Sequence, residues 1–197
     1  MSTRNLDKMM APKSVVAIGA SVRPGSVGAA VTRNLLAGAF HGNIHLVNVK
    51  GGEIDGRRVF RRLAEVPEVP DLAVVMTPAE TIPRLIRELG QRGTRVAVVI
   101  SAGPGNGVDG AEVNARWRRH ILRAAQPHLL RIVGPNTIGY AMPRLGLNAS
   151  FGPGNLKAGR IAAVAQSGAV LAGLADWGTA QGIGFSHLIS MGDMSDV

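Results

Sequence analysis

The stretch that most constrains the fold covers residues 15–40 and reads VVAIGASVRPGSVGAAVTRNLLAGAF. A short apolar run at residues 15–18 is typical of a buried strand, and the spacing of Val27, Val31 and Leu35 is typical of a helix. The turn between them is rich in glycine. Glycines let backbone N–H groups approach a ligand closely, and the unpaired N–H groups at a helix start attract anions. The stretch therefore predicts a strand, a phosphate-binding turn and a helix.

The turn alone leaves one alternative open. Its glycines fall at Gly19, Gly25 and Gly28, so the dinucleotide fingerprint G-x-G-x-x-G is not present as such. The loop is longer than that fingerprint and carries Arg23 and Pro24. An ordinary tight turn between a core strand and a core helix is the alternative to a phosphate site.

Four later apolar runs repeat the alternation of strand and helix. They cover residues 44–47, 72–76, 96–100 and 130–133. Because these runs are continuous, they predict a parallel sheet with helices on both faces, a Rossmann-like α/β fold. The loops that follow the strands, GAS, NVKGG, MTPAE, SAGPG and GPN, then share the edge at which open α/β sheets bind ligands.

Local signals refine these boundaries. A short helix is expected at residues 5–10, and a small hairpin in the glycine-rich loop after the second strand. The sequence Thr77-Pro78-Ala79-Glu80 is typical of a capping box, whereas Pro83 favours a slightly later helix start.

The chain is expected to form two domains. Residues 1–143 form the first, and residues 144–159, rich in glycine and proline, are interpreted as a linker. Residues 160–197 predict one further strand, helix and strand. Since a single β-α-β unit cannot cover its own faces, we expect this second α/β domain to be truncated and the chain to be a fragment of a longer polypeptide.

The net charge of +9 comes mainly from arginine, with clusters at residues 57–62 and 116–123. Few aromatic side chains accompany these clusters, so the sequence does not favour nucleic-acid binding. Both clusters are interpreted as solvated faces. The charge still favours a phosphate-rich ligand over long range.

Composition and missing motifs exclude several classes of function. The chain has no cysteine, which excludes disulfides, thiolate metal sites and a cysteine nucleophile, and favours a cytoplasmic location. It shows no secretory signal and no apolar run near the roughly 18 residues that span a bilayer, so no membrane partner is expected. The histidines lack metal-ligand spacing, Ser167 lies outside a nucleophile elbow, and no P-loop occurs. We therefore expect no metal site and no catalytic residue.

The end of the second strand bears on the kind of nucleotide. NAD-binding domains usually place Asp or Glu there, but this chain carries Asn48 and Lys50. An ammonium group prefers a phosphate, which favours a ligand with a phosphate on its ribose, such as coenzyme A or NADP. The alternative is that Lys50 is only an exposed loop residue.

Seven motifs in this order and spacing resemble one family. They are VVAIGASVRPGSVG, LVNVKGGEI, VVMTPAE, VVISAG, RIVGPNTIG, GLNASF and IAAVAQSGAV. The chain resembles the ADP-forming acyl-CoA synthetases (acetate–CoA ligases), which are relatives of the succinyl-CoA synthetase alpha subunit. A related module occurs in bacterial protein acetyltransferases. The resemblance implies a CoA-binding Rossmann-like domain followed by the start of a flavodoxin-like, succinyl-CoA-synthetase-like domain.

The resemblance also implies the site residues. The phosphates of CoA would be held by the turn, with Asn48 and Lys50 near the nucleotide end, a path across three later loops, and a phosphoryl-binding helix start in the second domain. The turn residues are Gly19, Ala20, Ser21, Pro24, Gly25, Ser26, Val27 and Gly28. The path comprises Met76, Thr77, Pro78, Ser101, Ala102 and Gly103, with Asn136 near the thiol, and the helix start comprises Gln166, Ser167 and Gly168.

The resemblance implies a reaction in which an acid, CoA and ATP give acyl-CoA, ADP and phosphate through a phosphohistidine. The family's phosphorylated histidine and ATP-grasp part are expected in missing C-terminal domains or a separate subunit, so this chain alone is expected to be inactive. A homo-oligomer is compatible with the sequence. A CoA-sensing regulatory domain of a protein acetyltransferase and an NADP-dependent oxidoreductase remain as alternatives. The chain departs from the family pattern at Val49, Thr137, Asp193 and Met194.

Overall fold

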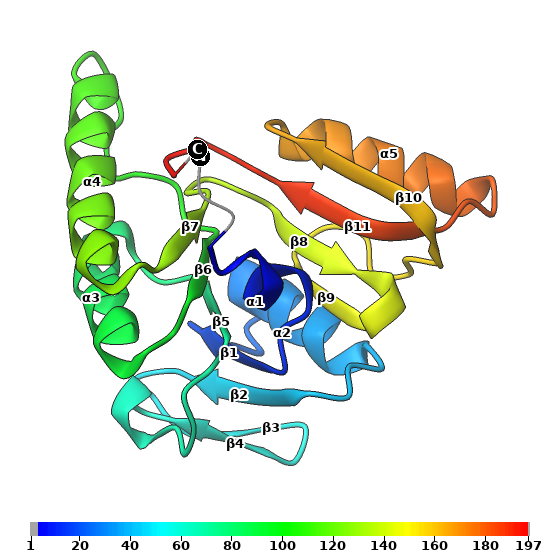
Figure 1. Cartoon of the computed structure of the whole chain (residues 1–197), viewed down its shortest axis with the longest axis horizontal. Helices are drawn as coiled ribbons and strands as arrows, with labels where there is room; N and C mark the ends of the chain where they lie inside the picture. Colours follow the sequence, from blue (N-terminus) through cyan, green and yellow to red (C-terminus); the bar gives the residue numbers. More distant parts are fainter. Residues whose placement is uncertain (1–3, 197) are drawn as a thin grey trace.

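The computed structural model describes residues 4–196 and contains two sheets (Figure 1). The larger has seven strands in the order β3-β4-β2-β1-β5-β6-β7. Neighbouring strands are parallel except for the β3–β4 hairpin. The strands are β1 (Ser14–Ile18), β2 (Asn43–Val47), β3 (Gly52–Ile54), β4 (Arg57–Phe60), β5 (Leu72–Val75), β6 (Val96–Val99) and β7 (Arg131–Val133).

Helices cover both faces of this sheet, which confirms the predicted fold class. Val15 of β1 packs in one core with Val31 and Leu35 of α2 (Val27–Ala37). The next residue, Val16, packs in a second core with α3 (Ile82–Arg92) and α4 (Gly110–Ala125). Because successive side chains of a strand point to opposite faces, continuous Val and Ile runs supply both cores. No helix among residues 4–196 is long and apolar enough to cross a membrane.

The second sheet has four strands in the order β10-β11-β8-β9. β10 (Ala158–Ala165) and β11 (Phe185–Ser190) are parallel and joined by α5 (Gly168–Ala180). β8 (Gly139–Met142) and β9 (Leu147–Ser150) form an antiparallel pair whose β8 also pairs with β11. This arrangement is the start of the expected flavodoxin-like domain, and the β8–β9 hairpin extends its sheet.

That hairpin corrects the prediction of an irregular linker. Residues 144–159 contain β9, preceded by a short 3₁₀-helix, Pro143–Leu145. This strand has only four residues, two of them polar, so it lacks the continuous apolar run that predicts the other strands. Asn148 Oδ1 accepts a hydrogen bond from Ser150 Oγ at 2.6 Å, and Asn148 Nδ2 donates to the Pro153 carbonyl at 3.0 Å. These bonds satisfy buried polar groups, so burial no longer requires apolar residues.

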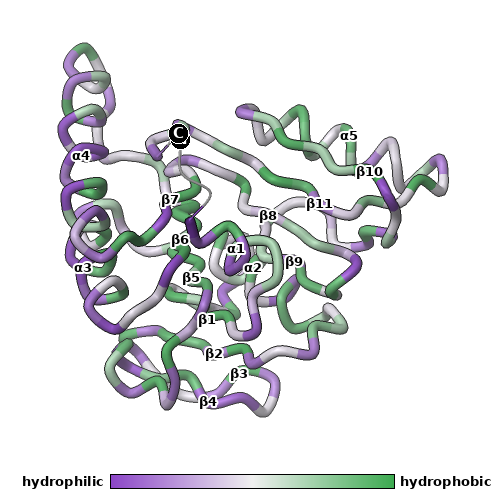
Figure 2. Tube along the Cα trace, in the orientation of Figure 1, coloured by the Kyte–Doolittle hydropathy of each residue, from purple (hydrophilic) through white to green (hydrophobic). Residues whose placement is uncertain are grey.

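α2 lies between the two sheets (Figure 1). Tyr140 and Met142 of β8 share the core of Val31 and Leu35. On the side of α2 toward β9, the Asn34 amide donates to the carbonyls of Ser150 and Gly152 at 2.8 and 3.0 Å. Figure 2 shows hydrophobic residues along the central strands and α5. The order of layers is therefore α3 and α4, the first sheet, α2, the second sheet and α5.

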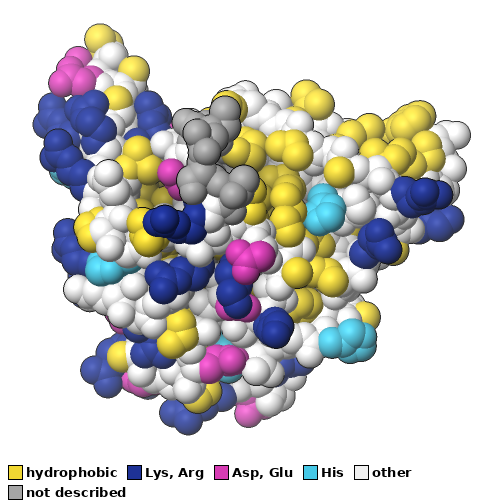
Figure 3. Space-filling view, in the orientation of Figure 1, with side chains coloured by type: hydrophobic (Ala, Val, Ile, Leu, Met, Phe, Trp, Pro, Cys, Tyr) yellow, Lys and Arg dark blue, Asp and Glu magenta, His cyan; other side chains and the backbone are white. Residues whose placement is uncertain are grey.

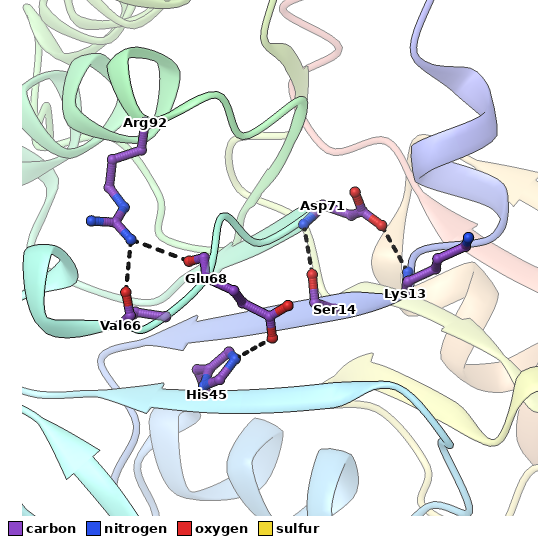
Figure 4. Close-up of polar contacts among 7 residues, drawn as sticks. All are labelled: Lys13, Ser14, His45, Val66, Glu68, Asp71 and Arg92. Carbon is purple, nitrogen blue, oxygen red and sulfur yellow. Dashed lines mark hydrogen bonds and ion pairs between the residues drawn. The ribbon is translucent and has the colours of Figure 1, made fainter.

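Polar contacts fix the amino-terminal edge of the first sheet (Figure 4). They hold the loop before β5 against β1, β2 and the end of α3. The residues are Lys13, Ser14, His45, Val66, Glu68, Asp71 and Arg92. Asp71 also pairs at 2.9 Å with Lys8 of α1 (Leu6–Met10), and this hydrogen-bonded carboxylate raises the pKa of Lys8.

The predicted capping box is wrong and the later helix start is confirmed. Residues Ala79–Thr81 form a 3₁₀-helix, and α3 begins at Ile82 with Pro83 in its first turn. Thr77 Oγ1 accepts from Thr81 Oγ1 at 2.8 Å, and no side chain caps the 3₁₀-helix. Two further 3₁₀-helices cover Leu63–Glu65 and Gln126–His128.

Candidate functional site

A cleft of about 1740 Å³ follows the carboxyl ends of the parallel strands. Going across the sheet, its lining includes Asn48 after β2, Gly19 after β1, Met76 after β5, Ser101 after β6 and Asn136 after β7. At about 4.8 Å between neighbouring strands, β2 and β7 lie about 19 Å apart. The cleft therefore suits a long, linear ligand.

The glycine-rich turn forms one wall of this cleft. Gly19 has a φ of 98°, and a Cβ atom on Gly28 would lie 2.4 Å from the Gly19 carbonyl oxygen. Neither position can carry a larger residue without moving the backbone. Ser26 Oγ caps α2 by accepting from Ala29 N at 3.2 Å. Because Ser26, Val27 and Gly28 line the cleft, the start of α2 presents unpaired N–H groups where an anion can bind.

Asn48 joins the turn to the loop after β2. Its Nδ2 donates to the Ala20 carbonyl at 2.8 Å, and its Oδ1 accepts from Lys50 N at 2.9 Å. Both functional groups of the Asn48 amide are thereby used in the fold. The neighbouring Lys50 is exposed, lines the cleft, and has no ion pair within residues 4–196.

Arginines reinforce the positive charge at this end of the cleft. Arg61 and Arg62 line it, although the sequence interpretation treated their cluster as a solvated face. A Cβ atom on Gly51 would lie 2.8 Å from Arg61 Cγ, so the Arg61 side chain packs against the loop of Lys50. Arg62 Nε lies 3.0 Å from Glu65 Oε1 and lowers the pKa of that carboxyl group through the hydrogen bond.

The sequence contains a signal for the position of Arg61 and Arg62. β4 runs parallel to β2, so the residues directly after Phe60 reach the same edge as Asn48. Recognising the residue run 57–60 as a parallel strand would have placed Arg61 and Arg62 at the cleft. Altogether five basic and two acidic residues line it: Arg23, Lys50, Arg61, Arg62, Arg84, Glu53 and Glu88.

The middle of the cleft is held together by bonds between successive loops. Ser101 Oγ donates to the Thr77 carbonyl at 2.6 Å, and Asn136 N donates to the Ser101 carbonyl at 3.0 Å. Each of the loops after β5, β6 and β7 is therefore hydrogen-bonded to the loop of the neighbouring strand. This arrangement gives the cleft a floor of fixed backbone.

The far end of the cleft belongs to both sheets. Ile138 and Phe151 contribute apolar surface. Ser167 caps α5 by accepting from Val170 N at 3.4 Å, and the start of that helix lines the cleft. The two sheets thus share one continuous site.

The structure brings together nearly all of the predicted site residues. Those that line the cleft are Gly19, Ala20, Ser21, Gly25, Ser26, Val27, Gly28, Asn48, Lys50, Met76, Thr77, Pro78, Ser101, Ala102, Asn136, Gln166, Ser167 and Gly168. Pro24 lies in an adjacent shallow groove. Gly103 packs against α4, where a Cβ atom would lie 2.2 Å from Asn114 Oδ1. Lining residues that the sequence interpretation did not select include Thr137, Ile138, Phe151, Ala169 and Gly192.

Comparison with known families gives two matches. The model of the CoA binding domain matches residues 13–143, and that of the succinyl-CoA ligase like flavodoxin domain matches residues 158–197.

Individual relatives agree with these matches. The chain is 37% identical, over 98% of its length, to the alpha subunit of an ADP-forming acetate–CoA ligase I from Pyrococcus furiosus, of which it spans 42%. It is 34% identical, over 95% of its length, to an ADP-forming acetate–CoA ligase I from Archaeoglobus fulgidus, of which it spans 27%. An acetyl-coenzyme A synthetase 1 from Ca. Korarchaeum cryptofilum superposes with a TM-score of 0.88 at 30% identity, over 98% of this chain and 41% of that one. The chain thus spans less than half the length of these relatives.

Proposed function

The chain belongs to the CoA-binding domain family, and from that premise we propose that it is the CoA-binding portion of an ADP-forming acyl-CoA ligase. One observation carries the proposal. A single cleft runs from a positively charged end at Lys50, past a glycine turn, to a helix start in the second sheet. Coenzyme A has the matching order of groups: a phosphorylated ribose, a diphosphate, a long pantetheine arm and a thiol.

The nucleotide half of CoA would bind at the end formed by β1 and β2. The diphosphate lies at the start of α2, where N–H groups and the helix dipole favour negative charge. Lys50 and Arg61 supply cations for the ribose phosphate. Asn48 supports this end indirectly, because its amide holds the turn and the Lys50 loop together.

The pantetheine arm would cross the loops after β5 and β6. Met76, Pro78 and Ala102 offer apolar contact there, and the Ser101–Thr77 bond fixes the backbone beneath the arm. The thiol would then lie near Asn136 and the start of α5. At that point a thiol could meet an acyl phosphate, with Ser167 and Gly168 supporting the phosphoryl group through the N–H groups of the helix start.

Phosphoryl transfer from ATP requires a nucleophile and an ATP site in addition to the CoA cleft. Transfer of a phosphoryl group through a histidine needs that nucleophile near a helix start and a separate site for ATP. We propose that a histidine-bearing segment and an ATP-grasp domain or subunit complete the enzyme. The alpha-subunit relative from Pyrococcus furiosus supports such a division.

Titration calorimetry tests the ligand. The chain is expected to bind CoA more tightly than NADPH or NAD. Tighter binding of NADPH than of CoA would overturn the proposal.

Lys50→Ala sharpens the same test. It is expected to cost about 1.5–3 kcal/mol of CoA binding if the ammonium contacts a phosphate directly, and at most about 1 kcal/mol if solvent separates them. The loss should shrink with dephospho-CoA, which lacks the ribose 3′-phosphate. Lys13→Ala is the matched control, because Lys13 is exposed at the opposite edge of the sheet. Unchanged CoA affinity in Lys50→Ala would leave Lys50 as an ordinary loop residue.

A further inference from the structure

The loops after β7 and β11 touch at the far end of the cleft, although they come from different sheets. Gly192 approaches so closely that a Cβ atom there would lie 2.2 Å from the Pro135 carbonyl oxygen. The next residue, Asp193, donates its backbone N–H to the same carbonyl at 2.8 Å. The main chain therefore fixes Asp193 beside Asn136.

The Asp193 carboxylate bridges two elements of the first domain. Its Oδ2 lies 3.1 Å from Nη1 of Arg118 on α4, and its Oδ1 accepts from Asn136 Nδ2 at 3.2 Å. The Arg118 and Asp193 side chains are 32% and 22% exposed, so solvent screens this pair only in part. Arg118 thus holds the Asp193 carboxylate in place, and the second carboxylate oxygen accepts the hydrogen bond from Asn136.

This contact determines which way the Asn136 amide faces. An ionised carboxylate can only accept hydrogen bonds, so the NH₂ group of Asn136 must point to Asp193. The amide oxygen is then left for another donor. The backbone of Asn136 is already fixed, with a φ of 57° and its N–H bonded to Ser101. Asn136 lines the cleft, whereas Asp193 and Arg118 do not.

We propose that Asp193 is a positioning residue that presents the Asn136 amide oxygen as an acceptor for a donor on the pantetheine arm of CoA. The arm carries two amide N–H groups and a thiol, which are suitable donors. Arg118 supports this role by fixing the carboxylate. The inference rests on the proposed function, because it assigns one end of the same cleft.

Two ligands separate this role from a general effect on folding. Asp193→Asn keeps the shape of the side chain, but the new amide can donate as well as accept a hydrogen bond. The Asn136 side-chain amide is then free to rotate and exchange the positions of its oxygen and nitrogen. We expect the substitution to weaken CoA about fivefold, as loss of one neutral hydrogen bond does. Adenosine 3′,5′-bisphosphate lacks the pantetheine arm. The variant's affinity for it should stay within about twofold of the unaltered chain's affinity, a difference too small to represent a lost hydrogen bond.

Further variants provide controls for this comparison. Asp176→Asn on α5 removes one exposed carboxylate that has no partner within residues 4–196, and should leave both affinities unchanged. Arg118→Met should reproduce the selective loss for CoA more weakly, and Arg119→Met on the same helix should not. If Asp193→Asn fails to fold, Arg118→Met decides the question by the same selectivity.

Each outcome has one meaning. Selective loss of CoA in Asp193→Asn or Arg118→Met supports the role. Equal weakening of both ligands overturns it, because the residue then acts on the fold. Unchanged CoA affinity in these variants, with CoA still bound by the original chain, overturns this inference alone. An original chain that binds neither ligand overturns the proposed function and this inference together.

Discussion

The two sheets differ in how completely their faces are covered. Every residue of β1, β5 and β6 in the first sheet is buried. In the second sheet every residue of β10 is exposed or only partly buried, and α5 buries only Leu171, Ala175 and Gly178. Hydrophobic side chains remain visible around α5 at the upper right of Figure 3. The exposed large hydrophobic residues of β10 and α5 are Ile161, Val164, Val170 and Trp177.

This contrast indicates that the sheets contribute unequally to the molecule. The first sheet has two full cores, and most of the stabilising burial lies there. The second sheet shares one of these cores, the one around α2, with the first sheet. It has only one small core of its own, beneath α5. Residues of both sheets line the candidate cleft, whereas stability is expected to depend mainly on the first sheet.

The largest expected effect comes from truncating one aliphatic side chain in each region. Ile86→Ala on α3 empties a fully buried position and should cost about 2–5 kcal/mol of unfolding free energy. Val170→Ala on α5 removes an exposed side chain and should change it by less than about 0.5 kcal/mol. Urea unfolding followed by circular dichroism measures both. Comparable losses would contradict the unequal contributions of the sheets.

Glycine substitutions should have opposite signs in the two regions. Gly28→Ala forces a Cβ atom against the Gly19 carbonyl and should destabilise the chain by about 1–3 kcal/mol while weakening CoA. Gly173→Ala on α5 meets no atom within 4 Å and should stabilise by about 0.5–1 kcal/mol through helix propensity. Thermal unfolding of the two variants gives the signs. A loss of stability in Gly173→Ala would show that α5 is packed more tightly than its exposure indicates.

Tyr140 tests the core that the sheets share. It is the only tyrosine in the chain, and burial raises the pKa of its phenol. A raised folded-state pKa gives stability that is present below the ordinary pKa of about 10 and is lost as pH rises beyond it. Phenolate absorbance should therefore appear only together with unfolding at alkaline pH. Absorbance that rises while the circular dichroism stays native would place Tyr140 in contact with solvent.

The smallest effect is one of accessibility. The two tryptophans report on the two regions, since Trp117 is 6% exposed and Trp177 is 55% exposed. Acrylamide should quench Trp177 several times more strongly than Trp117, with Trp117→Phe and Trp177→Phe isolating each signal. Equal quenching in the isolated chain would indicate that another surface covers α5, for example that of a second copy.

The same contrast explains what could be predicted from sequence. Continuous apolar runs in the first sheet identify strands directly, because both faces of each strand are buried. β9 lacks this signal, because two of its four residues are Asn148 and Ser150, whose buried side chains are hydrogen-bonded to each other. Thr77 looked like a cap, yet Pro83 moves the helix start to Ile82.

The candidate site divides in a similar way. The glycine turn and the strand ends are local signals, and most of the residues predicted there line the cleft. The contact of Asn136 with Asp193 joins residues 57 positions apart, and the two loops meet only after both sheets have formed. Arg61 lies at the cleft because β4 is parallel to β2, a pairing that spacing alone does not specify.

The burial of α2 between two sheets has a kinetic consequence. Its flanks are fixed by Val31 and Leu35 in the core and by the Asn34 bonds to the loop after β9. Because α2 is held from both sides, the anion site proposed at its amino end would be formed before a ligand binds. Association should then be governed by diffusion and electrostatic attraction, and residence time by the contacts made afterwards.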